Sequence, residues 1–247
     1  MTIARFFFPE SFSLDALIEL PDDVTHHIRV RRVRAGDDIV LFDGCGHEAR
    51  ARLVCSNKTA NQAQILEVSN ISRELRGRIT LVQALTNQDK LDWVIEKATE
   101  LGVHQLILVQ ASRSVVKLDG DRAKRRTEHG RRLIISASEQ CGRNELMQLK
   151  EPVSLKQALD ACGHLPKLAG VVVDSTESLL SPRILQRIAV TRACAIFIGP
   201  EGGWSPEEQK LLLASGSYAV QFGRRVLRTE TAGLFATSAL TALLDWG

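Results

Sequence analysis

The stretch IGPEGGWSPEE, residues 198–208, predicts a strand end, a glycine-rich elbow and a helix start in immediate succession. The apolar run 193–198 has the length of a buried strand and stops at a Gly-Pro pair. Beyond the elbow, Ser205 can cap a helix, Pro206 suits its first position, and Glu208 can complete a capping box. Glycines admit a close ligand, and N–H groups at a helix start favour acceptor atoms. This stretch alone leaves a cradle for a polar ligand and a plain tight turn equally open.

The composition is that of an ordinary soluble protein, since 44% of the 247 residues are hydrophobic and 25% are charged. The formal net charge of +3 is too small to argue for a nucleic-acid partner by itself. The five cysteines form no CxxC pair and are odd in number, which favours a reducing cytosol over disulfides or a zinc site. No apolar run reaches the roughly 18 to 20 residues of a membrane span. We therefore expect a cytoplasmic protein without membrane spans and without a metal.

Residues 1–70 are rich in strand signals and predict a small first domain. Gly44, Gly46 and Ala49 match the GxGxxA pattern of dinucleotide sites, which requires a helix to begin at the turn. Residues 47–55 alternate between two faces instead, so a β-hairpin is expected there. The expected elements are strands at 5–8, 38–42 and 47–55 and a helix at 21–30.

Four arginines within six residues stand out in this first domain, namely Arg29, Arg31, Arg32 and Arg34. Guanidinium groups suit phosphate because their planar fork donates hydrogen bonds in pairs. Residues 1–75 nevertheless hold nine Lys and Arg against eleven Asp and Glu. Any RNA contact here is therefore expected to be a stripe and not a basic domain.

A polar linker at 71–78 separates this domain from a second one at 79–247, where strands alternate with helices. Such alternation predicts a largely parallel sheet covered by helices on both faces, with ligands beyond the carboxyl ends of the strands. Residues 112–150 hold ten basic against five acidic residues, which leaves a solvated helix face and an RNA-facing surface as even alternatives. The expected strands are 79–85, 103–109, 171–174, 193–198 and 219–222, and the expected helices 89–101, 122–141 and 233–246.

A second elbow, FGRRVLRTETA at 222–232, follows the first within the last quarter of the chain. With IGPEGG it makes the chain resemble the RsmE family of 16S ribosomal RNA uridine-N3 methyltransferases, in the SPOUT superfamily. Further strings carry the resemblance over most of the chain. They are HHIRVRRVRAGDDIVLFDG at 26–44, DKLDWVIEKATELGV at 89–103, SRSVVK at 112–117 and SEQCGR at 138–143.

The resemblance implies an α/β trefoil-knot domain with a parallel sheet, preceded by a small PUA-like β-barrel that handles RNA. It also implies S-adenosylmethionine as cofactor, a homodimer, and 16S rRNA of the small ribosomal subunit as substrate. Phe222 stands where the family usually has Leu, which should alter the packing under the adenine. Asn144, Glu145 and Leu146 follow SEQCGR where a proline is common, which leaves the shape of that loop open.

Site residues follow from the same resemblance. Arg228 could steady the uridine anion or a phosphate, and either Glu201 or Glu230 could accept the N3 proton. The alternative for each carboxylate is a plain turn or helix-terminal residue. Cofactor contacts are expected from Gly199, Pro200, Gly202, Gly203, Phe222, Gly223, Val226, Leu227 and Thr231. RNA contacts are expected from Arg5, Arg29, Arg31, Arg32, Arg34, Arg113, Arg125 and Arg143.

Two other functions remain alternatives. One keeps the fold but directs methyl transfer to another base or to a ribose 2′-hydroxyl. The other is an RNA-binding ribosome assembly factor without catalysis, against which the two intact elbows argue.

Overall fold

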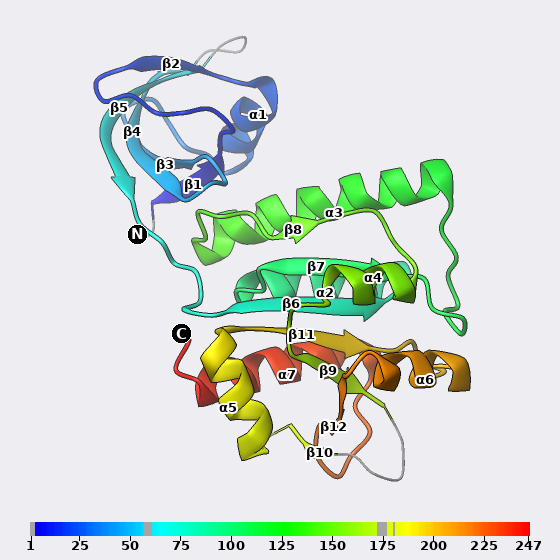
Figure 1. Cartoon of the computed structure of the whole chain (residues 1–247). Coiled ribbons are helices and arrows are strands. Elements are labelled where there is room, and N and C mark those ends of the chain that lie inside the picture. The colour runs from blue at the N-terminus through cyan, green and yellow to red at the C-terminus, as the bar shows by residue number, and fades with distance from the viewer. Residues whose placement is uncertain (1–2, 57–60, 172–176, 180) are drawn as a thin grey trace. The chain divides into compact units, whose positions relative to one another are not determined.

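The computed structural model describes residues 3–56, 61–171, 177–179 and 181–247 (Figure 1). The chain divides into two compact units. The first comprises Met1–Glu74 together with Ile135–Leu146, and the second comprises Leu75–Ile134 and Met147–Gly247. The predicted domain boundaries, 1–70 and 79–247 with a linker between them, stay a prediction. No sequence pattern indicated that a segment from the middle of the chain lies with the N-terminal strands.

The first unit is built on a curled sheet of five strands in its described residues, in the order β1-β3-β4-β5-β2 (Figure 1). The alternation predicted for β4 is present, because Ala49, Ala51 and Leu53 are fully buried beneath Phe6, Ile39 and their neighbours in one core. The elements are β1 (Ala4–Phe7), β2 (Leu17–Leu20), α1 (Asp22–Val30), β3 (Asp38–Phe42), β4 (His47–Ser56) and β5 (Asn61–Asn70).

The GxGxxA pattern forms a hairpin, as predicted, since β3 and β4 pair antiparallel across it. Asp43 sets the turn by accepting hydrogen bonds at Oδ1 from the backbone N–H groups of Cys45, at 2.7 Å, and His47, at 3.1 Å. Gly44 and Gly46 have φ of +77° and +110°, values that only glycine adopts readily. These glycines therefore serve turn geometry and not a dinucleotide.

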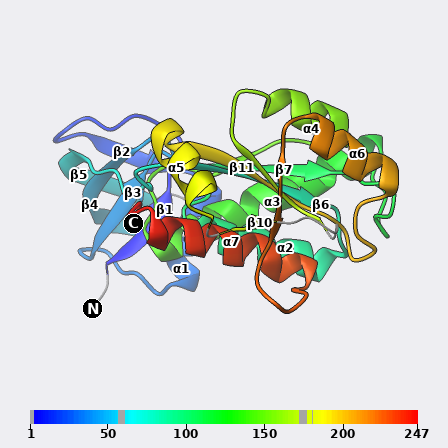
Figure 2. The same cartoon turned by 60° about the horizontal axis from the view of Figure 1, so that its bottom comes forward.

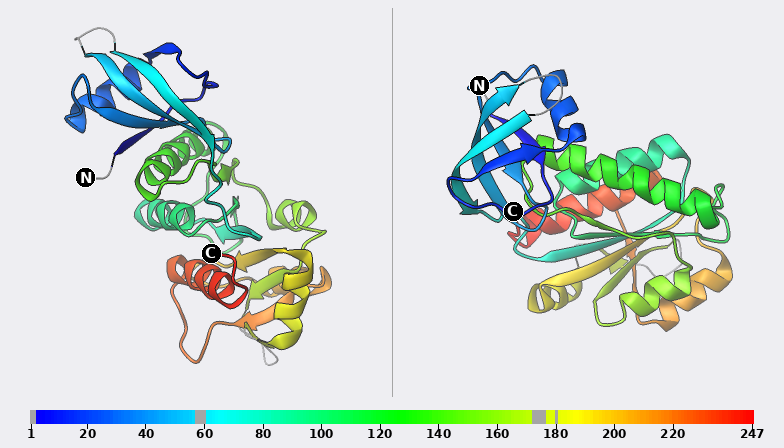
Figure 3. Two further views of the ribbon diagram at one scale, coloured as in Figure 1. Left: turned by 90° about the vertical axis from the view of Figure 1, so that its left-hand side faces the viewer. Right: turned by 90° about the horizontal axis from the view of Figure 1, so that it is seen from above.

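The second unit holds a seven-stranded parallel sheet in its described residues, in the order β10-β12-β9-β11-β6-β7-β8. Helices cover both faces of it, with α2 and α7 on one side and α4, α5 and α6 on the other (Figure 3). The strands are β6 (Arg78–Ala84), β7 (Gln105–Val109), β8 (Gln148–Leu149), β9 (Lys167–Gly170), β10 (Glu177–Ser178), β11 (Ala193–Ile198) and β12 (Tyr218–Gln221). The helices are α2 (Gln88–Glu100), α3 (Gly120–Cys141), α4 (Leu155–Ala161), α5 (Pro182–Thr191), α6 (Pro206–Ala214) and α7 (Thr229–Leu243).

The structure differs from the sequence prediction in several details, and helix α5 and strands β2, β5, β8 and β10 were not predicted. The strand expected at 171–174 is β9 and ends at Gly170; Val171 follows it, and 172–174 lie outside the described residues. Helix α7 begins four residues earlier than expected, because Arg228 already has the extended backbone of an N-cap. Helix α4 was not predicted, although Ser154 and Gln157 form a capping box that marks its start.

The sheet brings three strand ends to one edge. Strand β9 lies between β12 and β11 and is parallel to both. The first elbow follows β11 and the second follows β12, so both elbows leave the sheet beside the end of β9. Helix α7, which follows the second elbow, packs against α2 (Figure 2). The first turn of α2 therefore approaches the same edge.

Candidate functional site

The first elbow, residues 199–204, is fixed by the helix that follows it. Ser205 Oγ accepts from the backbone N–H of Glu208 at 3.2 Å, and Glu208 Oε2 accepts from the N–H of Ser205 at 2.8 Å, which confirms the predicted capping box. The other oxygen of Glu208 accepts from the N–H of Ser112 at 2.8 Å. One buried carboxylate thus ties the elbow to the loop after β7.

Close packing explains the glycines of this elbow. A Cβ on Gly199 would lie 3.1 Å from the indole nitrogen of Trp204, a side chain that is buried under the elbow. Gly203 has a φ of +67°, in the left-handed region. The carbonyl of Gly202 accepts a hydrogen bond from Arg113 Nη1 at 3.0 Å. The loop backbone is therefore held by packing against Trp204 and by the hydrogen bond from Arg113.

The second elbow, residues 222–228, is joined to the first by Thr229. Its hydroxyl donates to the carbonyl of Gly199 at 2.6 Å and accepts from Nε2 of the fully buried Gln83 at 2.9 Å. Strand β6, the first elbow and the start of α7 are thus connected through one hydroxyl. Gly223, with a φ of +109°, lets the chain turn away from β12.

The two elbows enclose a cavity of about 850 Å³, within the range of about 300 to 1,000 Å³ typical of small-molecule sites. Its floor includes Gly170, where a Cβ would lie 2.8 Å from Cε2 of Phe222. Phe222 also meets Phe235 edge to face at 6.4 Å. Eight of the nine expected cofactor residues line the cavity, namely Gly199, Pro200, Gly202, Gly203, Phe222, Gly223, Val226 and Leu227. Thr231 does not line it.

All three expected catalytic residues line the cavity, and a lysine lies between two of them. Lys90 Nζ is 2.9 Å from Glu201 Oε1 and 3.5 Å from Glu230 Oε2. Burial acts to raise the pKa of Glu201, but the hydrogen bond from Lys90, a backbone hydrogen bond at Glu201 and the charge of Lys90 together hold that pKa below its usual value. The hydrogen bond with Glu201 also raises the pKa of Lys90. The pair is therefore ionised at neutral pH.

Arg228 is the most solvent-exposed of the expected catalytic residues. Its side chain is 82% exposed, and Nη1 lies 3.9 Å from Glu230 Oε1. The guanidinium group is therefore positioned at the cavity rim and is available to a second molecule.

Sequence reasoning missed several residues of this site. Lys90 sits in the string DKLDWVIEKATELGV, but helical periodicity draws attention only to the apolar face of that helix. Gly170 is the last residue of β9, a strand whose position the sequence prediction misjudged. Arg224 and Arg225 were also missed, although the string GRR in the second elbow could have indicated them. Both line the cavity and are exposed.

The expected RNA-binding arginines fall into two groups. Arg113 and Arg125 of the second unit are exposed. The stripe on and after α1 is exposed as well and consists of Arg29, Arg31, Arg32 and Arg34. Arg5 and Arg143, by contrast, are largely buried in ion pairs.

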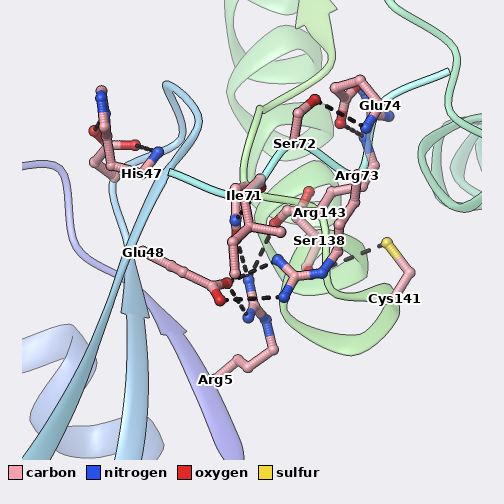
Figure 4. A network of polar contacts seen from close by, with 12 residues as sticks. Arg5, His47, Glu48, Ile71, Ser72, Arg73, Glu74, Ser138, Cys141 and Arg143 are labelled. Carbon is pink, nitrogen blue, oxygen red and sulfur yellow. Dashed lines mark hydrogen bonds and ion pairs between the residues drawn. The ribbon is translucent and has the colours of Figure 1, made fainter. Parts of the chain in front are cut away.

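Figure 4 shows these two arginines within a network inside the first unit. Arg5 Nη1 and Arg73 Nη1 each donate to Glu48 Oε2 at 2.8 Å, and Arg73 Nη2 donates to Glu48 Oε1 at 3.1 Å. Arg143 pairs with Glu74 through Nε at 2.8 Å and through Nη2. Their guanidinium groups are thus engaged by carboxylates.

The loop that departs from the family pattern completes this network. Asn144 is buried, accepts from Arg5 Nη2, and donates from Nδ2 to the carbonyl of Ile71 at 2.8 Å. The backbone of Leu146 donates to the carbonyl of Gly44 at 3.0 Å. The loop is therefore well anchored without a proline.

Comparison with known proteins defines the class to which this fold and site belong. A family model described as an RNA methyltransferase domain matches residues 73–241, and one described as an RNA methyltransferase PUA domain matches residues 20–66. The protein is thus an RNA methyltransferase of two parts, which confirms the predicted fold class.

Individual relatives narrow the class to a family. The chain is 34% identical to Ribosomal RNA small subunit methyltransferase E of Bacillus subtilis over 89% of its own length and 87% of the relative. A crystal structure of the Neisseria gonorrhoeae methyltransferase E bound to S-adenosyl methionine matches with a TM-score of 0.91 at 34% identity, covering 98% of each chain. A Legionella pneumophila putative methyltransferase in complex with the same cofactor matches with a TM-score of 0.88 at 30% identity, again covering 98% of each. The chain belongs to the ribosomal RNA small subunit methyltransferase E family, as predicted.

The described residues contain neither a membrane-spanning helix nor a cluster of side chains suited to a metal ion. No helix among them is long and apolar enough to cross a bilayer. No group of three or more His, Cys, Asp or Glu side chains lies close enough together, within the same ranges, to hold a metal ion.

Proposed function

We propose that the protein transfers a methyl group from S-adenosylmethionine to N3 of a uridine in 16S rRNA of the small ribosomal subunit. The observation that carries the proposal is the cavity formed jointly by the two elbows at the ends of β9, β11 and β12. The similarity to two structures that hold the cofactor supports it. The relatives' shared name supports ribosomal RNA as the substrate. The cytoplasm is the compartment we propose, because small-subunit rRNA is assembled there.

The residues present fit S-adenosylmethionine. The volume is ample, Gly170 and Gly199 let the aromatic rings of Phe222 and Trp204 pack closely against the backbone, and Phe222 supplies an apolar surface. The carboxylates of Glu201 and Glu230 complement a positive sulfonium. Loop backbone and not a charged side chain would hold most of the cofactor, which when bound supplies an activated methyl group.

Methyl transfer to N3 requires an aligned acceptor and removal of the imide proton. A carboxylate of the cavity would accept that proton. Arg228 at the rim would stabilise the negative charge that develops on the uridine carbonyl oxygens. The N3 edge is the pairing edge of the base, so the uridine must enter the site swung out of any helix.

The proposed RNA surface consists of exposed arginines. We assign it to Arg113 and Arg125, to the rim arginines Arg224 and Arg225, and to the stripe formed by Arg29, Arg31, Arg32 and Arg34. We leave Arg5 and Arg143 out of it, because their guanidinium groups already bind buried carboxylates. Phosphate contacts of this kind make affinity fall as salt rises.

A homodimer is the proposed assembly. Val226 in the second elbow is 93% exposed, and Phe235 and Leu243 of α7 are also exposed apolar side chains. A second copy that covers them would remove apolar area from water. Sedimentation equilibrium of the wild-type chain and of Phe235→Asp tests this, since a monomeric wild type would contradict it.

Two measurements test the function. Calorimetry with S-adenosylmethionine should show stoichiometric binding; the absence of binding heat at high cofactor excess would support the assembly-factor alternative. Nucleoside mass spectrometry of rRNA from a deletion strain should show loss of 3-methyluridine, restored by the wild-type gene. Loss of a ribose-methylated nucleoside instead would show that the acceptor is wrong.

Arg228→Ala should lower turnover by about 100-fold while cofactor affinity stays nearly unchanged, because the side chain acts on developing charge. Single-turnover rates and calorimetry measure the two quantities separately. A joint collapse of affinity and turnover would place Arg228 with the cofactor. Arg187→Ala, on the exposed face of α5, is the matched control and should change neither quantity.

A further inference from the structure

Lys90 of α2 has a fixed backbone and reaches two other elements of the site. Asn87 caps α2 by accepting at Oδ1 from the backbone N–H of Lys90 at 3.2 Å, so the lysine begins from a defined position in the first helical turn. Its ammonium group contacts Glu201 of the first elbow and Glu230 at the start of α7. One cation thus lies between the two carboxylates that could serve as bases.

The two carboxylates differ in their surroundings. Glu201 is 34% exposed and accepts a hydrogen bond at Oε1 from the ammonium group of Lys90 at 2.9 Å. The side chain of Glu230 is 13% exposed, and its Oε2 is buried without a hydrogen-bond partner in the described structure. The ammonium of Lys90 is 3.5 Å from that oxygen, and Arg228 approaches the other oxygen at 3.9 Å. Glu230 is therefore near two cations and retains a lone pair to accept a proton.

We infer that Lys90 is a positioning residue that assigns different roles to the two carboxylates. It holds Glu201 as a fixed negative charge and leaves Glu230 to accept the proton from N3 of the uridine. The inference rests on the proposed function and deepens it by selecting the base.

The reason is competition for the same lone pairs. A carboxylate that accepts a short hydrogen bond from an ammonium group is stabilised as the anion and becomes a weaker base. The lowered pKa of Glu201 agrees with this. At 3.5 Å the contact from Lys90 to Glu230 is longer than its contact to Glu201, so it stabilises the charge of Glu230 but holds that oxygen less tightly during proton transfer.

The N3–H bond breaks and its proton bonds to an oxygen of Glu230. The electron pair left on N3 forms the new bond to the methyl carbon while the methyl–sulfur bond breaks and its pair stays on sulfur. The products are 3-methyluridine, a neutral thioether and a protonated Glu230, which returns its proton to solvent. Glu201 and Lys90 keep their charges throughout.

Single-turnover methylation of small-subunit rRNA by the full-length enzyme, measured across pH, tests the inference. Glu230→Gln should lower the rate by about 100-fold or more, the usual contribution of a general base. It should also abolish the fall in rate at acid pH that reports protonation of the base. Glu201→Gln should lower the rate by about 10-fold or less and keep that acid limb.

The pH profile of Lys90→Gln separates positioning from a merely structural role. Removing a cation raises the pKa of a neighbouring carboxylic acid, so the acid limb should move to higher pH. Lys90→Arg keeps the positive charge, so its fall in rate at acid pH should lie close to the pH at which the wild type shows it. Lys97→Gln is the matched control, because Lys97 lies on the same helix and also pairs with two glutamates, but outside the cavity. It should leave both rate and profile unchanged.

Two results would overturn the inference. One is an acid limb that stays in place in Lys90→Gln, whatever happens to its melting temperature. The other is a larger loss of rate in Glu201→Gln than in Glu230→Gln. Failure of the proposed function is distinguishable, because the wild type would then neither bind S-adenosylmethionine in calorimetry nor form 3-methyluridine.

Discussion

In the first unit one carboxylate, Glu48, lies between two guanidinium groups, whereas in the second unit one ammonium group, that of Lys90, lies between two carboxylates. Both oxygens of Glu48 accept hydrogen bonds, and its side chain is only 11% exposed. At Lys90 one carboxylate oxygen, Oε2 of Glu230, has no hydrogen-bond partner in the described structure. A network whose carboxylate accepts hydrogen bonds at both oxygens stabilises the fold, while one with an open acceptor can receive a substrate proton.

Glu48→Gln should have the largest effect on stability. It leaves Arg5 and Arg73 without their counter-charge in a mostly buried network, which should cost about 3 kcal/mol of unfolding free energy. The melting temperature should fall by roughly 6 to 12 °C for a chain of this size. Glu67→Gln on the exposed side of β5 is the control and should leave the melting temperature unchanged. Equal effects of the two variants would contradict a stabilising role of the network.

Acid should remove the same stabilisation in the wild type. Burial acts to raise the pKa of Glu48, but the hydrogen bonds from Arg73 and Arg5 lower it to about 2, compared with about 4.3 in an unfolded chain. Because the folded value is the lower one, the contribution is complete above the unfolded pKa and is lost as pH falls towards 2. Urea denaturation of wild type and Glu48→Gln at several pH values should show their difference shrinking below about pH 4. A constant difference down to pH 2 would show that Glu48 is not the titrating group.

Thr229→Val should have an intermediate effect, because it breaks the connection between the elbows. The substitution keeps the shape but leaves the Gly199 carbonyl and the Gln83 amide without this partner, at a cost of about 1 to 2 kcal/mol. Thr229→Ser keeps the hydroxyl and should cost less. Denaturant unfolding measures stability, and calorimetry with S-adenosylmethionine should show weaker binding to the Val variant alone. Identical behaviour of both variants would mean that the hydroxyl is dispensable.

Glu201→Gln should have the smallest effect on stability, below about 1 kcal/mol, because the pair with Lys90 is partly exposed to solvent. Raising the salt concentration should reduce this difference further. A loss comparable with that of Glu48→Gln would remove the contrast between the two networks.

Local chemistry made much of this molecule predictable. The capping box of Ser205 and Glu208, the end of α2 at Gly102 and the hairpin after β3 each depend on residues close in sequence. The two elbows could be located for the same reason, and the resemblance to a known family gave them a ligand.

What could not be predicted depends on partners that are distant in sequence. Arg125 and Arg143 both stand in the same basic segment of the sequence. Arg125 is exposed, whereas Arg143 binds Glu74, 69 residues away. Lys90 is separated from Glu201 by 111 residues, so no spacing pattern links them. Periodicity reports which face of a helix is apolar, and it does not report which polar side chain reaches a site.

The inclusion of Ile135–Leu146 in the first unit has a consequence for synthesis of the chain. Arg5 binds Asn144, 139 residues later, and Gly44 accepts from Leu146. During translation the N-terminal strands leave the ribosome long before these partners exist. The first unit therefore cannot be completed until Leu75–Ile134, the first part of the second unit, has also been made, unlike an N-terminal domain that is continuous in sequence. Its last contacts form only when more than half of the protein has been made. Completion of the first unit therefore overlaps in time with synthesis of the second.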